Sequence, residues 1–257
     1  MSIDLKGFVE GTVCRLIPWT DTEFSIGVMA DVQPYTAGQF TKLALKNNKG
    51  EWTRRAYSFV NSPNHAAGHK EMEFLIIDVK SGHLSPKLAE LTIGDQVWVG
   101  EKASGFMTLS EVPKTINNLW LLSTGTAIGP FLSILAEIEA QKRFDDIVLV
   151  HAVRTKQELV YQELITHLLK LYHGRLQYIP VVSREKITGI HSDRIPTLLL
   201  NNELFTTTKI VPTKEQSFFY LCGNPEMVRD TKLALTTLGF NKHLRRTAGN
   251  FSSENYW

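Results

Sequence analysis

The first 110 positions alternate hydrophobic and polar residues in short runs, which is the spacing of half-buried β-strands. Turn residues such as Pro34 and Gly50 separate the runs. One short helix interrupts them, with Ser85 as its N-cap and Pro86 at its first position. The pattern predicts an antiparallel barrel or sandwich, with strands over 8–19, 24–32, 40–46, 55–60, 72–79 and 96–101.

The pattern changes near Val112 and Pro113. Beyond that point, apolar runs of strand length alternate with stretches that repeat apolar residues at helical spacing. Strands are predicted over 117–126, 146–153, 175–183 and 217–223, and helices over 129–143, 157–172 and 225–239. This alternation is typical of a parallel sheet covered by helices. We therefore predict two domains, a β-barrel over 1–111 and an α/β domain over 112–257.

Composition and charge exclude several classes of protein. The formal net charge is only +2, so we expect no nucleic-acid partner. Two distant cysteines, Cys14 and Cys222, form no disulfide framework and cannot hold an iron–sulfur cluster that needs four thiolates from this chain. No apolar stretch has the length of a signal peptide core or a membrane span. We expect a cytoplasmic protein without a membrane partner, and a monomer, because the sequence contains no dimerisation signal.

Two glycine turns follow predicted strands and precede predicted helices, in the stretches STGTAIGPF (123–131) and YLCGNPEMV (220–228). In an open α/β sheet, ligands collect at such strand ends, and a helix N-terminus favours a phosphate there. The alternative is a pair of tight turns without a ligand. Cys222 is expected at the mouth of the crevice, either as part of the site or as a small buried hydrophobic residue.

Basic residues also follow strand ends. Arg154 ends one strand, Ser183 and Arg184 end the next, and Arg194 follows in the sequence HSDRIP. Arginine binds phosphate through two parallel hydrogen bonds, so these residues favour a phosphorylated nicotinamide dinucleotide. The alternative is a set of unrelated surface arginines.

The stretch RRAYSFVNSP (54–63) combines cations, aromatic rings and a hydroxyl. In a strand, Arg55, Tyr57 and Phe59 share one face. Arg55 could hold a pyrophosphate, Tyr57 could stack on a flat heterocycle, and Ser58 could contact a ring nitrogen. The segment SGHLSP (81–86) precedes the short helix and could offer amides to a second phosphate. The terminal aromatic residues either patch a groove or stack on a planar cofactor.

In this order and spacing, RAYS, GHLS, TGTAIGPF, VSR, CGNPEMV and the terminal YW resemble the bacterial ferredoxin/flavodoxin–NADP reductases, especially the enterobacterial subgroup. The resemblance covers nearly the whole chain. It implies a Greek-key barrel that binds FAD, followed by an α/β domain that binds NADP. GHLS has histidine where close relatives have lysine. Plant-type members end near a glutamate and a single tyrosine, whereas Glu254 here stands three residues from the end, and the resemblance does not decide whether it relays protons.

The resemblance also implies a role for each site residue. The FAD contacts are Arg55, Ala56, Tyr57, Ser58, His83, Leu84, Ser85, Thr126, Tyr256 and Trp257. The NADP contacts are Thr124, Gly125, Arg154, Ser183, Arg184, Arg194, Gly223, Asn224 and Met227. Ser58 lies near flavin N5, Cys222 lies beside the nicotinamide, and Tyr256 covers one flavin face; these three are the catalytic residues. No metal is implied.

The implied activity is electron transfer between NADPH and a ferredoxin or flavodoxin, with hydride transfer at flavin N5. Such partners are acidic, and the basic segment with Lys242, His243, Arg245 and Arg246 is a candidate docking face. The same segment could instead grip FAD or stay solvated. Two other functions remain open, an NADPH-dependent reductase of flavins or ferric chelates and a flavin-binding redox sensor.

Overall fold

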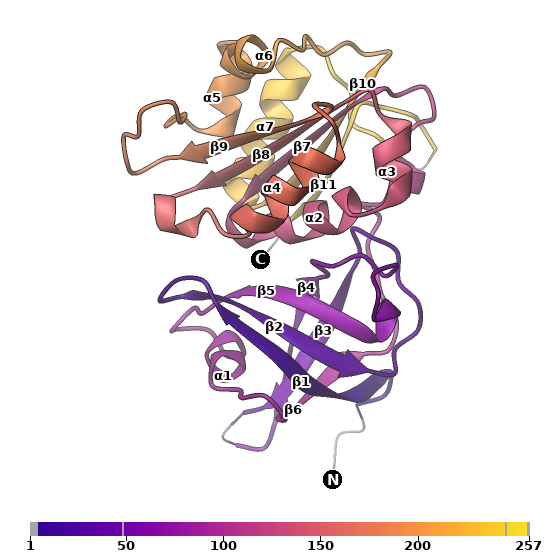
Figure 1. The fold of residues 1–257 in the computed structure, drawn as a ribbon, viewed down its shortest axis with the longest axis vertical. Helices are drawn as coiled ribbons and strands as arrows, with labels where there is room; N and C mark the ends of the chain where they lie inside the picture. Colours follow the sequence, from indigo (N-terminus) through magenta and orange to yellow (C-terminus); the bar gives the residue numbers. More distant parts are fainter. Residues whose placement is uncertain (1–4, 48, 245, 256–257) are drawn as a thin grey trace.

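The first lobe of the molecule is a closed antiparallel barrel (Figure 1). The computed structural model describes residues 5–47, 49–244 and 246–255. The six strands are hydrogen-bonded in the order β4-β3-β6-β1-β2-β5, with β6 between β3 and β1 as in a Greek key. A bridge between Phe59 and Phe74 joins the two edges and closes the sheet. The elements are β1 (Phe8–Pro18), β2 (Glu23–Ala30), β3 (Phe40–Lys46), β4 (Trp52–Ser58), β5 (Glu71–Ile77), β6 (Gln96–Gly100) and the helix α1 (Ser85–Ala89).

The second lobe contains a five-stranded parallel sheet in the order β11-β10-β7-β8-β9. The chain enters this sheet at its centre, moves outward to β9, and then crosses to the other side. The strand order therefore reverses between β7 and β10. The strands are β7 (Asn118–Thr124), β8 (Asp146–Val153), β9 (Leu176–Val182), β10 (Ser217–Gly223) and β11 (Phe251–Asn255).

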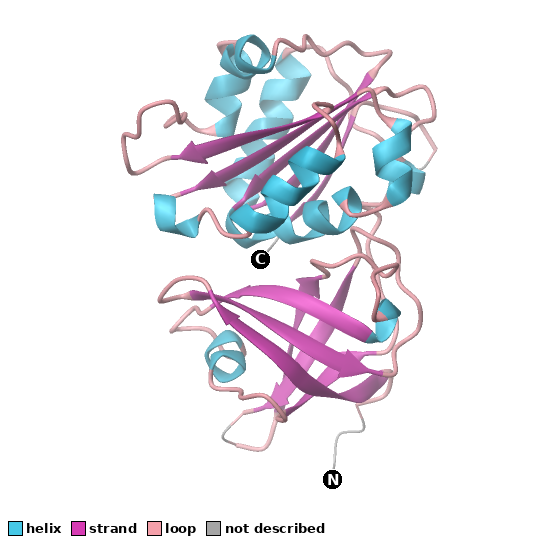
Figure 2. Cartoon of the chain, viewed as in Figure 1, coloured by secondary structure: helices cyan, strands magenta, loops and turns pink. Residues whose placement is uncertain are grey.

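Helices cover both faces of the parallel sheet (Figure 2). Along β7, Leu119 and Leu121 belong to the core beneath α2, α3 and α4, whereas Trp120 and Leu122 belong to the core beneath α5, α6 and α7. This alternation is what a strand buried on both faces requires. The helices are α2 (Gly129–Leu135), α3 (Ile138–Arg143), α4 (Gln162–Leu171), α5 (Ile195–Leu200), α6 (Glu203–Thr208) and α7 (Pro225–Thr237), with single 3₁₀ turns η1 (Gly68–Lys70), η2 (Leu109–Glu111), η3 (Gly125–Ile128) and η4 (Lys156–Glu158). The predicted barrel and α/β sheet are both confirmed.

Two predicted helices are broken, and each break lies where a side chain contacts the barrel. The helix predicted over 129–143 divides into α2 and α3, because Glu137 adopts an extended backbone. The Glu137 carboxylate accepts hydrogen bonds from the Ser62 hydroxyl and from Asn64 Nδ2 (2.8 Å) on a barrel loop. The helix predicted over 157–172 is replaced by η4 and α4. Tyr161, just before α4, has a left-handed φ of 60°.

Tyr161 belongs to a buried chain of hydrogen bonds between the lobes. Trp19 Nε1 donates to Ser25 Oγ (2.8 Å), which lies 2.6 Å from the Tyr161 hydroxyl oxygen. The Tyr161 hydroxyl donates to the Glu73 carboxylate, which also accepts from Arg15 Nη2 (2.8 Å). Since Tyr161 is the one member of this chain of bonds that comes from the α/β domain, its hydroxyl joins that domain to the barrel.

Several other details differ from the prediction. The sequence pattern gave no indication of β11, α5 or α6. Ser85 is the first residue of α1 and not its cap, and its hydroxyl accepts a bond from the Val79 amide (3.1 Å) in the preceding loop. Phe59 lies beyond the end of β4, inside the barrel, where it stacks on Tyr35 with ring centroids 3.8 Å apart. In the described ranges, no helix is long and apolar enough to cross a bilayer.

Candidate functional site

The carboxyl ends of β7 and β10 form the crevice at which ligands bind in open α/β sheets. A Cβ placed on Gly223 would lie 2.0 Å from Thr124 Oγ1, and the φ of Gly223 is +144°. The Asn224 amide donates to the same Thr124 oxygen (3.0 Å). The Thr124 hydroxyl is therefore packed against the backbone of the second glycine turn, and position 223 has no room for a side chain.

Helix α7 begins at this crevice. The Asn224 side chain caps it by accepting hydrogen bonds from the amides of Glu226 (2.8 Å) and Met227 (3.4 Å). Pro225 at the first helical position suits the same start. The positive end of the helix dipole therefore lies beside the cavity that Asn224 and Met227 line.

A cavity of about 390 Å³ occupies the crevice; we call it the α/β cavity. The residues predicted to bind NADP all line it: Thr124, Gly125, Arg154, Ser183, Arg184, Arg194, Gly223, Asn224 and Met227. The structure thus brings the three arginines from separate loops to one place. Their binding of a phosphate remains a prediction.

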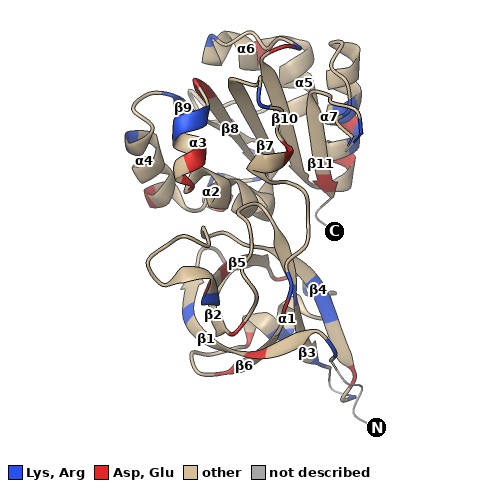
Figure 3. Ribbon diagram, turned by 90° about the vertical axis from the view of Figure 1, so that its right-hand side faces the viewer, with Lys and Arg blue, Asp and Glu red and all other residues tan. Residues whose placement is uncertain are grey.

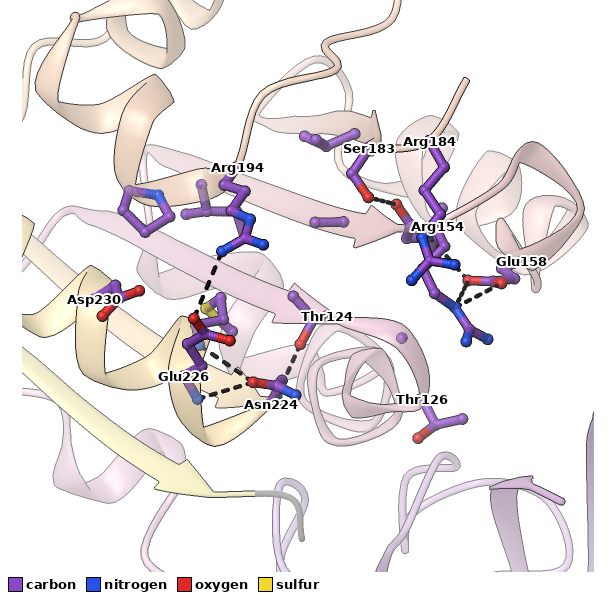
Figure 4. A pocket seen from close by; sticks show the side chains of 18 of the residues that line it. Thr124, Thr126, Arg154, Glu158, Ser183, Arg184, Arg194, Asn224, Glu226 and Asp230 are labelled. Carbon is purple, nitrogen blue, oxygen red and sulfur yellow. Dashed lines mark hydrogen bonds and ion pairs between the residues drawn. The ribbon is translucent and has the colours of Figure 1, made fainter. Parts of the chain in front are cut away.

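Two of the three arginines of the α/β cavity, Arg154 and Arg194, already have acidic partners (Figure 4). Arg154 Nε lies 3.0 Å from Glu158 Oε1, and the Arg154 amide donates to the other oxygen of that carboxylate (3.0 Å). Arg194 Nη1 lies 3.8 Å from Glu226 Oε1. Sequence reasoning missed these acids. The four-residue spacing of Arg154 and Glu158 was the available signal.

Three further acids line the same cavity: Glu23, Asp193 and Asp230. Glu23 comes from the barrel and is only 2% exposed. Nothing in its local sequence distinguishes it from a solvated residue on the outer face of a strand. Only the docking of the second domain buries it.

His151 of β8 supports the glycine turn at Gly125 through a hydrogen bond. It is fully buried at the end of β8, and its Nε2–H donates to the Gly125 carbonyl (3.1 Å). Burial lowers the pKa of His151 to about 4, so the ring is neutral at physiological pH. A histidine within an apolar strand carries no sequence signal of this role.

A second cavity, of about 840 Å³, opens on the barrel; we call it the barrel cavity. Of the residues predicted to contact FAD, those that line this cavity are Arg55, Ala56, Tyr57, Ser58, His83, Leu84, Ser85 and Thr126. Phe59 does not line it. Burial raises the pKa of Tyr57 to about 12, so this phenol stays protonated and offers its ring as a stacking surface.

The loop before α1 turns tightly beside the barrel cavity. The Gly82 amide donates to the Val79 carbonyl (2.6 Å), and a Cβ on Gly82 would lie 2.8 Å from that oxygen. This geometry turns the backbone of His83, Leu84 and Ser85 along the cavity wall, where all three residues contact the cavity. The prediction that His83 acts through its backbone is compatible with its exposed side chain.

The carboxyl end of the chain reaches the barrel cavity through β11. Glu254 and Asn255 line that cavity, and Glu254 Oε1 accepts a bond from the Phe106 amide (2.9 Å). Burial raises the pKa of Glu254, and the amides of Phe106 and Met107 oppose that shift. Tyr256 and Trp257 lie outside the described residues, so their predicted stacking on FAD remains a prediction.

The two cavities adjoin each other, because Ile77 and Thr126 line both. Cys222 lines neither. It is not at the mouth of the crevice but 1% exposed in the core between the domains, and burial raises the pKa of its thiol well above the usual range. Its role beside the nicotinamide stays a prediction. Within the described part of the chain, no group of three potential metal ligands occurs.

The sizes and linings of the cavities fit the two expected cofactors. The barrel cavity lies within the usual volume range of ligand pockets and combines a protonated tyrosine ring with Arg55 and a turned backbone segment. The α/β cavity has a helix N-terminus and three arginines, which suit phosphate groups. Most of these residues come from elements that the sequence predicted, whereas Arg194 caps α5 and Glu254 lies on β11, which it did not predict.

Family models match both halves of the chain. The model described as an oxidoreductase FAD-binding domain matches residues 20–101, and the model described as an oxidoreductase NAD-binding domain matches residues 121–233. A crystal structure of a ferredoxin NADP⁺ reductase from Neisseria gonorrhoeae, with bound FAD and NADP, superposes with a TM-score of 0.89. It is 31% identical, and the match covers 97% of this chain and 98% of that one.

Full-length relatives agree with the domain matches. The flavodoxin/ferredoxin–NADP reductase of Escherichia coli strain K12 is 47% identical over 254 residues, which is 98% of this chain and all of the relative. The protein of the same name from Rhodobacter capsulatus is 31% identical over 90% of this chain and 86% of its own. With both domains, their order and the whole length shared, this chain belongs to the flavodoxin/ferredoxin–NADP reductase family.

Proposed function

We propose that this protein binds FAD in the barrel cavity and NADPH in the α/β cavity, and that it transfers electrons between NADPH and a ferredoxin or flavodoxin. The observation that carries the proposal is the shared wall of the two cavities at Ile77 and Thr126. Ligands in adjoining cavities can bring their reactive rings into contact, which a direct transfer requires. When bound in the barrel cavity, FAD would supply hydride-accepting and one-electron redox chemistry.

The barrel residues hold and orient the first ligand. Tyr57 presents a ring for stacking, and the Arg55 guanidinium, whose Nη1 also donates to the Arg54 carbonyl (2.8 Å), supplies charge for a phosphate. Ser58 is 3% exposed and lines the cavity, which supports its predicted contact with a ring nitrogen. Glu254 of β11 also lines this cavity and is a candidate for moving a proton.

The α/β residues select the second ligand. Arg154, Arg184 and Arg194 line the α/β cavity with Ser183, a set suited to the extra phosphate of NADPH. Thr124 and Gly125 lie near the junction, together with Thr126. The dinucleotide would therefore lie with its phosphorylated adenosine at the arginines and its nicotinamide toward the barrel. Cys222 would act only through packing, since its thiol is buried and protonated.

Acidic electron carriers are the proposed protein partners. The names of the relatives support ferredoxin or flavodoxin. Lys and Arg lie along β4 at the side of the barrel (Figure 3), and Lys242 and Arg246 are exposed in the segment before β11. Docking on this segment stays a prediction, and Arg245 lies outside the described residues. No described residue of 241–250 lines the barrel cavity, so the structure offers no support for a grip on FAD.

An anaerobic visible spectrum tests the function. The purified protein should be yellow, NADPH should bleach it, and oxidised flavodoxin or ferredoxin should restore the colour at a rate that salt lowers. A yellow protein that NADPH cannot bleach would favour the redox sensor. Faster reoxidation by ferric citrate or free flavin than by either carrier would favour the flavin or ferric-chelate reductase. A colourless protein that does not bind added FAD would refute the proposal.

A further inference from the structure

Glu23 extends from the barrel into the α/β cavity. It opens β2, where it pairs with Ile77 of β5, the residue at the junction of the two cavities. Alternate residues of a strand share a face, so Glu23 lies on the same side as Ser25, whose hydroxyl contacts Tyr161 of the other domain. Glu23 therefore faces the α/β domain, and it lines the cavity that the three arginines also line.

The Glu23 side chain is buried without a hydrogen bond to one of its oxygens. Its exposed fraction is 2%, and Oε2 has no partner among the described residues. An ionised carboxylate in such a place is costly, because water no longer solvates the charge. The free cavity therefore favours the neutral acid, whose O–H needs an acceptor.

The charged neighbours of Glu23 do not remove this cost. Glu158 and Arg154 face it from the segment after β8, but they are paired with each other. Asp78 follows Ile77 on the neighbouring strand. Burial first, and Glu158 second, raise the pKa of Glu23 to about 7, while Arg154 opposes the shift. Near neutral pH, about half of the molecules would carry a neutral Glu23.

We propose that Glu23 is a specificity-determining residue of the dinucleotide cavity, which donates a hydrogen bond to a phosphate oxygen of the ligand when neutral and repels the phosphates when ionised. The inference rests on the proposed function, because it assigns an anionic dinucleotide to this cavity. A phosphate is the matching acceptor, since Glu23 lines the cavity close to Arg154, whose charge acts on it and which is predicted to bind a phosphate. The affinity for NADP⁺ should then depend on whether Glu23, a residue of the barrel, is protonated.

Isothermal titration of the oxidised, FAD-loaded protein with NADP⁺ tests this role between pH 6 and 8.5. The variants are Glu23→Gln, which is permanently neutral and keeps a donor, and Glu23→Leu, which is neutral without one. Glu90→Gln removes an exposed barrel carboxylate outside both cavities and is the matched control. Repeating the titration in buffers of different ionisation enthalpy counts the protons taken up with the ligand.

As pH rises, the wild-type protein and the Glu90 control should bind NADP⁺ progressively more weakly than Glu23→Gln does. At pH 8.5 the difference in affinity should reach about tenfold, which corresponds to a rise of one unit in the pKa of Glu23 when NADP⁺ binds. They should also take up a fraction of a proton near pH 7 that Glu23→Gln does not. The comparison between proteins cancels the titration of the ligand's own phosphate, which is common to all of them. Weaker binding by Glu23→Leu than by Glu23→Gln identifies the donated hydrogen bond.

Parallel pH profiles and equal proton uptake in wild type and Glu23→Gln would overturn the inference and leave the proposed function intact. Weaker binding by Glu23→Gln at every pH would also overturn it, because Glu23 would then act as a carboxylate. No binding of NADP⁺ by any of the proteins would refute the proposed function itself.

Thermal unfolding provides a second readout. A carboxyl whose folded pKa is raised binds more protons when folded, so it destabilises the protein increasingly as pH rises from about 4.5 to 7. The melting temperature of Glu23→Gln minus that of wild type should therefore be larger at pH 8 than at pH 5. A difference that does not change with pH would contradict a buried, titrating Glu23.

Discussion

The two cavities of this reductase share a wall but differ in chemistry. The barrel cavity is lined largely by apolar and aromatic residues, with Arg55, Tyr57, His83 and Glu254 as its charged or titratable groups. The α/β cavity holds three arginines and five acids: Arg154, Arg184, Arg194, Glu23, Glu158, Asp193, Glu226 and Asp230. One cavity thus offers a surface for stacking, and the other offers charges that partly compensate one another.

This difference explains how a resident cofactor and an exchanging substrate can be bound side by side. Burial of a large flat ring against apolar residues gives a tight complex, because few polar groups must be desolvated. In the α/β cavity, Arg154 and Arg194 keep N–H groups for a phosphate, but Glu158 and Glu226 lie beside them. The negative charge of these acids offsets part of the attraction between each arginine and a phosphate. Such a site favours reversible binding.

Gly223→Ala should have the largest effect, and it should impair ligand binding in the α/β cavity while leaving the barrel cavity intact. The added Cβ would lie 2.0 Å from Thr124 Oγ1 and would also strain the backbone, so the two glycine turns must move apart. We expect at least a 100-fold loss of NADP⁺ affinity, with FAD binding retained, because the barrel cavity does not include residue 223. Titration with NADP⁺ and the flavin absorbance of the purified variant measure the two effects.

Gly174→Ala is the matched control for that variant. Gly174 also has a positive φ, +87°, but a Cβ added there would meet no atom within 4 Å. It should lower stability by about 1 kcal/mol through strain alone and leave NADP⁺ affinity unchanged. Equal losses of affinity in the two variants would show that strain, and not the contact with Thr124, is responsible.

Replacing Arg184 and Arg194 together with alanine should have the next largest effect. Each arginine is exposed, which limits its contribution, so we expect NADPH affinity to fall about 10- to 100-fold in the double variant. NADH, which lacks the extra phosphate, should lose less than threefold. The ratio of kcat/KM for the two substrates measures the change. Arg229→Ala is the control, because Arg229 lies on α7 near Glu226 but does not line the cavity. Equal losses for NADPH and NADH would contradict recognition of the phosphate.

Local patterns predicted most of the fold and most of the site. Alternation predicted the barrel strands, and the strand ends predicted where Arg154, Ser183 and Arg184 meet. The failures lie where the domains touch. Glu137 and Tyr161 interrupt helices whose spacing looks continuous, because their side chains contact barrel residues far away in sequence. Helical periodicity carries no information about such contacts.

The missed site residues have the same origin. Glu23 is unremarkable within β2 and becomes buried only because a second domain covers its strand. His151 is a polar residue in an apolar strand, and its bond to Gly125 depends on the position of β7 beside β8. Strand β11 has the sequence FSSEN, which lacks the β-branched pattern that identifies strands, and it forms by pairing along β10.

Tyr161→Phe should have the smallest effect on either cavity, because it acts on the contact between the domains. Without the hydroxyl, the Glu73 carboxylate and the Ser25 hydroxyl each lose a buried partner, which should lower the free energy of unfolding by about 1–3 kcal/mol. Tyr172→Phe removes a comparable buried bond, to the Leu135 carbonyl (2.8 Å), within the α/β domain alone. Denaturant unfolding should show similar losses of stability for both variants. Only Tyr161→Phe should also slow reduction of the flavin by NADPH, by a few fold, because of the two bonds only that of Tyr161 joins the domains. If both variants reduced the flavin at the wild-type rate, the remaining contacts across the boundary, such as the hydrogen bonds to Glu137 and the apolar contacts of Leu75 and Val60, would be sufficient to hold the domains in register.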